Sequence, residues 1–202
     1  MSDNNHNHNH NDELIDPNTW EFYEIYEPGV YDFDDQHVFM SGWSNGSDVY
    51  DLARNLADDG VITFGVGQLK KDEPGYVQKT MNRLEEETGI NFERVPYYLA
   101  EIQIDYVDVI TGVSNPEFIN GLATVWNGEL DSWSQVQILD DGSNSLWRGT
   151  MVHEIGHALG LGHDHSTVHS IMSYERNRAN EWFYPQDLAA LEHLYDPYFA
   201  SV

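Results

Sequence analysis

The feature that most constrains this chain is a short run in which three histidines and one glutamate stand at fixed spacing. His153 and His157 lie four residues apart, so on a helix their imidazoles project from one face, one turn apart, and can reach a common ion. His163 cannot join them if the helix simply continues. Gly160 removes this obstacle, because glycine at a helix C-terminus takes the left-handed conformation at little cost and lets the chain turn back. The run therefore predicts three imidazoles around one ion.

The ligand set and its neighbour predict a catalytic rather than a structural zinc site. Three neutral imidazoles from His153, His157 and His163 leave one tetrahedral position open for water. Glu154 follows the first of them, on a helix face from which its carboxylate reaches that water without binding the metal. We therefore expect one catalytic Zn2+ with Glu154 as the general base. The alternative is a helix whose histidines are fortuitous.

The downstream sequence adds a methionine turn, Ser170-Ile171-Met172-Ser173-Tyr174. Together, His-Glu-x-x-His-x-x-Gly-x-x-His and this turn resemble the metzincin clan of zinc endopeptidases, and in particular its matrixins and serralysins. The resemblance implies an enzyme, a zinc metalloendopeptidase that hydrolyses peptide bonds in proteins or peptides through a zinc-activated water. It also implies an extracellular protein, and we expect a monomer.

The resemblance assigns further roles around the zinc. Met172 is expected as the hydrophobic floor beneath the histidines, since a thioether is a poor zinc ligand beside three imidazoles. Tyr174 matches the serralysin and astacin tyrosine that ligates zinc or swings to stabilise the transition state; an ordinary core tyrosine is the alternative. Trp182, Phe183 and Tyr184 lie where the family builds the wall of the pocket for the residue after the scissile bond.

Signals for the subfamily conflict. Asp164, after the third ligand, resembles adamalysins and snapalysin, whereas serine is usual there in matrixins and proline in serralysins. The methionine turn instead resembles serralysins or astacins, so only the clan is assigned. His165 and His169 are expected as loop histidines near the cleft, because the zinc already has three ligands. No histidine occurs between His37 and His153, which argues against the second, structural zinc of matrixins.

The apolar pattern of the remaining chain predicts an α+β fold. Strands are predicted where apolar residues alternate or run continuously, at 61–66, 90–95, 100–106, 122–126 and 135–139. Helices are predicted where they recur at helical spacing, at 48–58, 76–88, 145–160 and 185–195. This order resembles the zincin-like metzincin catalytic domain, which has a twisted, mostly parallel five-stranded sheet with an antiparallel edge strand, an active-site helix, the methionine turn and a C-terminal helix. There the edge strand binds the substrate as an added strand, which assigns substrate binding to Leu122, Ala123, Thr124 and Val125.

The formal charge of −26, with a sequence pI near 4.3, argues against nucleic acid or an anionic membrane as a partner, since both would be repelled. Three explanations for the charge stay open. They are adaptation to high salt, solubility alone, and calcium binding at clusters such as Asp140-Asp141. Matrixins and serralysins commonly carry structural calcium. The chain has no cysteine, so neither disulfides nor the cysteine-switch latency of vertebrate matrixins is available.

The N-terminal part of the chain stands apart in composition. Residues 1–16 include alternating histidine and asparagine, and we expect a disordered tail or an affinity tag. We assign 17–202 to a single catalytic domain. Within it, the aromatic and acidic segment 17–59 is either an N-terminal extension or a pro-segment. In a pro-segment, an aspartate of Asp32-Phe33-Asp34-Asp35 would reach the zinc. The simpler interpretation is that these acids are solvated turn residues. No export signal or apolar stretch of membrane-spanning length is visible.

A different function class competes with the enzyme. A non-catalytic zinc-binding or adhesion module on a metzincin scaffold would keep the three histidines. Decay of this kind should first damage the group that only the chemistry requires, yet Glu154 is intact.

Overall fold

The fold is organised around a five-stranded sheet in a computed structural model that describes residues 30–33, 37–40, 49–67, 73–113, 120–127, 132–139, 147–164, 167–173, 176 and 180–199. The strand order is β4-β3-β5-β7-β6. Three neighbouring pairs are parallel, and β6 at the edge is antiparallel to β7. The strands are β3 (Ile62–Val66), β4 (Phe92–Arg94), β5 (Ile102–Val107), β6 (Gly121–Asn127) and β7 (Ser132–Leu139). The predicted α+β architecture and antiparallel edge strand are confirmed.

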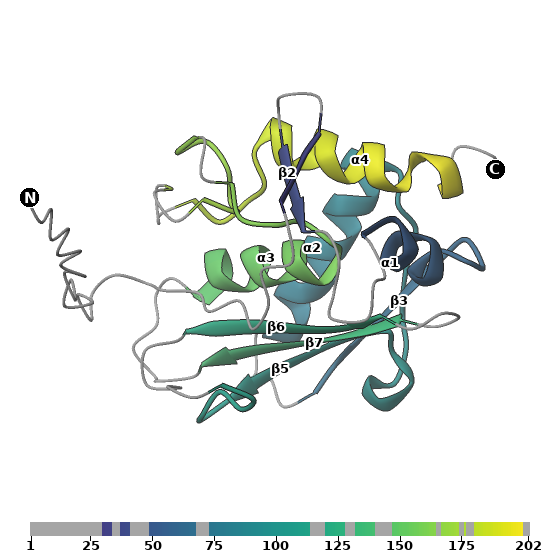
Figure 1. The fold of residues 1–202 in the computed structure, drawn as a ribbon. Helices are drawn as coiled ribbons and strands as arrows, with labels where there is room; N and C mark the ends of the chain where they lie inside the picture. Colours follow the sequence, from purple (N-terminus) through teal and green to yellow (C-terminus); the bar gives the residue numbers. More distant parts are fainter. Residues whose placement is uncertain are drawn as a thin grey trace, which may run out of the picture.

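Four helices lie on one side of this sheet (Figure 1). They are α1 (Val49–Leu56), α2 (Glu73–Thr88), α3 (Trp147–Ala158) and α4 (Pro185–Phe199). A short 3-10 helix, η1 (Tyr97–Leu99), connects β4 to β5. In the described ranges no helix is long and apolar enough to cross a bilayer.

Alternation along the central strands explains how the sheet and helices share one core. On β5, Ile102, Ile104 and Tyr106 are buried, whereas the residues between them are only half-buried. Their partners repeat this pattern, with Phe64 on β3 opposite Ile102 and Val136 on β7 opposite Ile104. One face of the sheet is therefore apolar, and the helices cover it.

Two helices are longer than the predicted ranges. Helix α2 begins at Glu73 rather than Tyr76, and Pro74 is tolerated because the first turn needs no backbone N–H donor. Helix α4 continues past Tyr195 to Phe199 and runs through Pro197. The reason is packing, since Tyr198 and Phe199 are partly buried against the core and the Phe199 ring lies 6.3 Å from that of Tyr195.

A two-stranded hairpin was not among the predicted elements. Strands β1 (Val30–Phe33) and β2 (His37–Met40) pair antiparallel, and β2 contacts α4. The signal was present, because both segments are rich in β-branched and aromatic residues and flank a short polar link. Asp32 lies on β1, whereas Asp34 and Asp35 lie outside the described residues.

The C-terminal end of α3 is held by side chains from two other elements. The last carbonyls of a helix have no partner within it and need one elsewhere. The Tyr195 hydroxyl of α4 donates to the Leu159 carbonyl at 3.1 Å, and Ser134 Oγ of β7 donates to the Ala158 carbonyl at 3.2 Å. The sheet and α4 thus fix the end of α3 between them.

Replacing Tyr195 by phenylalanine tests this anchor. The variant keeps the ring but leaves the buried Leu159 carbonyl without its donor. We expect the free energy of unfolding to fall by about 1–3 kcal/mol, measured by denaturant unfolding of the metal-free protein. Tyr98→Phe, at a side chain that is 77% exposed, is the matched control and should leave stability unchanged. Equal stability of the two variants would contradict this role.

Candidate metal centre

The turn after α3 has the conformation that the glycine predicts. Gly160 has a φ of 99°, in the left-handed region. The Leu161 N–H donates to the Gly156 carbonyl at 2.9 Å, and the Gly160 N–H donates to the His157 carbonyl at 2.9 Å. These two bonds form the Schellman ending of a helix. The chain reverses there and carries His163 back toward α3.

The three histidines meet in the interior at short and nearly equal separations. Nε2 of His153 lies 3.2 Å from Nε2 of His163, and Nε2 of His157 lies 3.1 Å from each of the other two. Ligands of a tetrahedral zinc at about 2.0–2.1 Å stand roughly 3.3 Å apart. Among the described residues, these three form the one group of metal-ligating side chains close enough to hold an ion.

The positions of the protons on His153 and His157 indicate that the space between the three Nε2 atoms suits a cation. Nδ1 of His153 lies 2.7 Å from the Ile171 carbonyl, and Nδ1 of His157 lies 2.7 Å from the Leu161 carbonyl. A carbonyl oxygen only accepts, so each Nδ1 carries the proton and each Nε2 presents a lone pair. Two lone pairs facing each other at 3.1 Å repel, and a shared cation turns that repulsion into ligation. The donor set therefore fits zinc.

Burial keeps two of these imidazoles in the form that binds metal. Burial lowers the pKa of His153 well below its usual range, and the positive charge of Arg176 acts in the same direction. Burial also lowers the pKa of His157 to about 4, against the opposing hydrogen bond to the Leu161 carbonyl. Both rings are therefore neutral at pH 7, as metal ligation requires.

The side chain of Glu154 lies between α3 and the first residue of the edge strand. It is buried and belongs to no metal-ligating group of the described residues. A Cβ on Gly121 would lie 2.8 Å from Oε1 of Glu154 and 2.6 Å from Cγ2 of Thr150. A side chain at position 121 would therefore push the strand away from α3. Gly121 was not predicted as part of the site; its signal is a glycine at the start of an apolar strand, which marks close backbone approach.

Met172 packs against the backbone of α3 between two of the predicted ligands. A Cβ on Gly156 would lie 2.5 Å from Sδ of Met172 and 3.3 Å from Cε1 of Phe183. The thioether thus rests on the helix one residue before His157. The Asp164 N–H also donates to the Met172 carbonyl at 3.2 Å, which joins the turn to the segment that carries His163.

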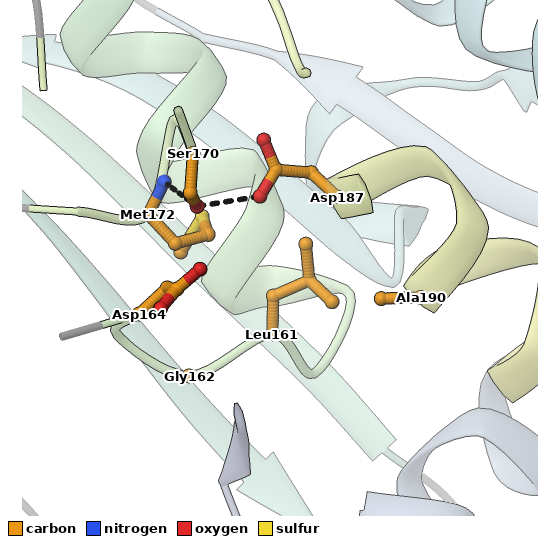
Figure 2. Close-up of a pocket in the computed structure, with 7 residues that line it drawn as sticks. All are labelled: Leu161, Gly162, Asp164, Ser170, Met172, Asp187 and Ala190. Carbon is orange, nitrogen blue, oxygen red and sulfur yellow. Dashed lines mark hydrogen bonds between the residues drawn. The ribbon is translucent and has the colours of Figure 1, made fainter. Parts of the chain in front are cut away.

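Asp187, in the first turn of α4, holds the methionine turn in place. Its carboxylate accepts hydrogen bonds from Ser170 Oγ at 2.5 Å, the Ile171 N–H at 2.9 Å and the Tyr184 N–H at 2.8 Å. Figure 2 shows Asp187 and Ser170 facing each other beside Met172. The Ile171 carbonyl is the group that orients His153, so the backbone of a single residue links Asp187 to a predicted metal ligand.

Asp187 was not predicted as part of the site. The sequence carried only a weak signal, an acidic residue in the first turn of a helix, which is favourable for the helix wherever it packs. Burial raises the pKa of the Asp187 carboxyl, whereas its hydrogen bonds to Ser170, Ile171 and Tyr184 lower it.

The other predicted residues are placed only in part. Leu122 and Val125 are buried on the edge strand, and Ala123 and Thr124 are half-buried. Phe183 contacts the metal-binding helix, and the ring of Tyr184 lies 5.9 Å from that of the exposed His169. Three predicted sites lie outside the described residues: Tyr174, His165 and the Asp140-Asp141 pair.

Comparison with known proteins identifies the family. The profile of the matrixin peptidases matches residues 66–196, which is more than half of the 202-residue chain and includes the three histidines. Comparison with the curated proteins finds no match. The family and the three-histidine cluster together support a zinc metalloprotease at family level. Asp164 stands where serine is usual in matrixins, but the matched region includes four of the five sheet strands in full, helix α3 and most of α4, and the chain belongs to the matrixin family.

Proposed function

We propose that this chain is a zinc-dependent endopeptidase in which His153, His157 and His163 hold the metal and Glu154 is the general base. The observation that carries the proposal is the meeting of three Nε2 atoms at 3.1–3.2 Å, with the Nδ1 protons of two rings committed to backbone carbonyls. A structural role for the metal would not require a buried carboxylate next to the first ligand.

Bound zinc supplies Lewis acidity, which polarises the scissile carbonyl and lowers the pKa of water to about 7. Glu154 takes the proton from the attacking water and then passes it to the leaving amine. Burial beside Gly121 keeps the Glu154 carboxylate at one place on the edge strand, so a peptide bound there meets the base in a fixed position. Tyr174 is proposed to donate a hydrogen bond to the carbonyl oxygen as negative charge develops on it.

The edge strand supports an extended polypeptide as the substrate. Strand β6 is last in the sheet and pairs only with β7 among the described strands. Its outer backbone groups suit a peptide bound as an added strand, with Leu122 to Val125 as the binding segment. Because Glu154 lies against Gly121, the base and the proposed substrate strand meet at the beginning of β6.

Further assignments remain proposals. We propose an extracellular setting, since matrixins are typically extracellular, and a monomeric enzyme. We also propose a single catalytic domain over 17–202, with 17–59 as a pro-segment or an N-terminal extension. Calcium is proposed as a second ion. The rival function, a zinc-binding module without catalysis, predicts the same metal site but no dependence on Glu154.

Replacing Glu154 by glutamine separates these functions. The variant keeps the size of the side chain but removes the base, so peptide hydrolysis should fall by about 10²–10⁴-fold in kcat while one zinc stays bound. Casein or peptide cleavage and metal analysis are the two measurements. Glu93→Gln, at an exposed position on β4, should cleave like the parent protein. Full activity in Glu154→Gln would remove Glu154 from the mechanism.

Metal removal should affect both activity and stability. Chelation should abolish cleavage, and added zinc should restore it. Chelation should also lower the Tm, because it removes a bound ligand, and a ligand present at 1,000 times its Kd stabilises the folded state by about 4 kcal/mol. In His157→Ala, which lacks one of the three ligands, the Tm should no longer respond to chelator or zinc. A Tm of the parent protein that ignores zinc would count against the site.

The link from Asp187 to His153 gives a third prediction. Asp187→Ala removes both acceptor oxygens and leaves the Ser170 hydroxyl and the N–H groups of Ile171 and Tyr184 without their acceptor. Loss of such support typically weakens metal affinity about 10–100-fold, and we expect a loss of this size in competition with a chromophoric chelator. Glu192→Gln, at an exposed position of α4, is the control. Unchanged zinc affinity in Asp187→Ala would contradict the link.

A further inference from the structure

The sheet face that the helices cover carries smaller side chains toward the edge strand. In one row across three strands, Tyr106 of β5 lies opposite Ile138 of β7, and Ile138 lies opposite Gly121 of β6. The side chains of this row decrease from a phenol ring to a butyl group to a hydrogen atom. Helix α3 lies over β6 and β7 (Figure 1). The row therefore lets α3 approach the sheet backbone most closely at the edge strand.

Two buried side chains of α3 occupy the space that Gly121 leaves. Thr150 and Glu154 lie four residues apart and project from the same face of the helix. A Cβ at position 121 would lie 2.6 Å from Cγ2 of Thr150, 2.8 Å from Oε1 of Glu154 and 2.9 Å from Cγ of Glu154. Rotation of the carboxylate would relieve only the contact with Oε1. We call this approach of Gly121 to Thr150 and Glu154 the Gly121 contact.

The backbone conformation of Gly121 does not require glycine. Its φ lies outside the left-handed region, so an alanine could adopt the same backbone. Glycine inside a strand weakens the strand and often marks a place where another group approaches closely. The reason for glycine at position 121 is therefore the space that Thr150 and Glu154 occupy.

The metal ligands and Glu154 are held by different parts of the fold. Successive residues of a helix point about 100° apart, so His153 and Glu154 face different neighbours. His153 and His157 are oriented by the carbonyls of Ile171 and Leu161, which belong to the two turns after α3. Glu154 instead lies against the edge strand. A change at the edge strand should therefore move the carboxylate and leave the ligands in place.

We propose that Gly121 and Thr150 are positioning residues, which hold the Glu154 carboxylate where it can take the proton from the attacking water. This inference rests on the proposed endopeptidase function. A general base acts only within hydrogen-bond reach of the proton that it removes, and a misplacement of about 1 Å can cost about 10²-fold in rate. The Gly121 contact thus controls kcat and contributes to neither metal affinity nor substrate affinity.

The first test compares two glycine-to-alanine variants of the zinc-loaded protein. In Gly121→Ala we expect kcat for peptide hydrolysis to fall by about 10–100-fold, while KM and zinc affinity change by less than about twofold. The matched control is Gly75→Ala, at an exposed position of α2 where an added Cβ meets nothing within 4 Å, and it should behave like the parent protein. A rise in KM at unchanged kcat, or an equal loss in both variants, would overturn the proposal.

A second test asks whether Gly121 acts through Glu154. In a protein that already carries Glu154→Gln, the added Gly121→Ala should cost no further activity, because the base is already absent. A further tenfold loss there would overturn the proposal.

Thr150→Ser gives a rescue, because it removes the Cγ2 methyl and keeps the hydroxyl. Added to Gly121→Ala, it should raise kcat by about threefold or more, since the new methyl can then move away from Glu154. Absence of this rescue would overturn the role of Thr150.

A structural measurement separates failure of this inference from failure of the proposed function. Crystal structures of the metal-free parent protein and of Gly121→Ala require neither zinc nor turnover. We expect the Glu154 carboxylate to be displaced by about 1 Å or more in the variant, while the three Nε2 atoms stay 3.1–3.2 Å apart. If the parent protein cleaves nothing, the endopeptidase function fails while the two structures still judge the Gly121 contact. A carboxylate that keeps its place would overturn the contact at any level of activity.

Discussion

Three imidazole nitrogens brought within 3.2 Å of one another impose the constraint on which the rest of this structure depends. Buried lone pairs at that distance repel, so the fold must hold each ring from behind. For two of the three rings it does so through the backbone, since the Ile171 and Leu161 carbonyls fix His153 and His157. Those carbonyls come from the methionine turn and from the Schellman turn after α3. Metal geometry is therefore set by two turns as much as by the helix.

This constraint requires α3 to pack closely against both the edge strand and the methionine turn. Helix α3 is buried along its length from Gly149 to Ala158 and packs between the edge strand and the methionine turn. Gly121 lets the strand lie against Glu154, and Gly156 lets Met172 lie against the helix. A methyl group at either position would separate a layer from α3. The proposed base, ligands and substrate strand share one small region because these two positions lack side chains.

The C-terminal segment of the chain joins the site to elements distant in sequence. Asp187 connects α4 to the methionine turn, Tyr195 connects α4 to the end of α3, and Trp182 connects the segment before α4 to α2. The first two contacts are buried hydrogen bonds and act on the metal-binding helix. The third is half-exposed and holds the segment between the methionine turn and α4. The C-terminal segment is thus joined to the methionine turn, to α3 and to α2 by separate contacts.

The sequence by itself determined the elements whose signal is local. Spacing of histidines, a glycine at a helix end and alternation of apolar residues act over a few residues, and they predicted α3, the left-handed turn at Gly160 and the five strands of the sheet. The resemblance to metzincins supplied the strand arrangement that local pattern does not contain.

Only the tertiary structure decided what depends on distant neighbours. In the sequence, Asp187 is an ordinary acid in the first turn of a helix, and the structure shows that it binds the methionine turn. Glu87 is in the sequence one half of a surface ion pair, and the structure shows that it also accepts a hydrogen bond from Trp182. The need for glycine at positions 121 and 156 is visible only in the structure, where side chains of other elements pack directly against both backbones. The physical reason is that hydrogen bonding and close packing between elements leave no periodic trace in either partner's sequence.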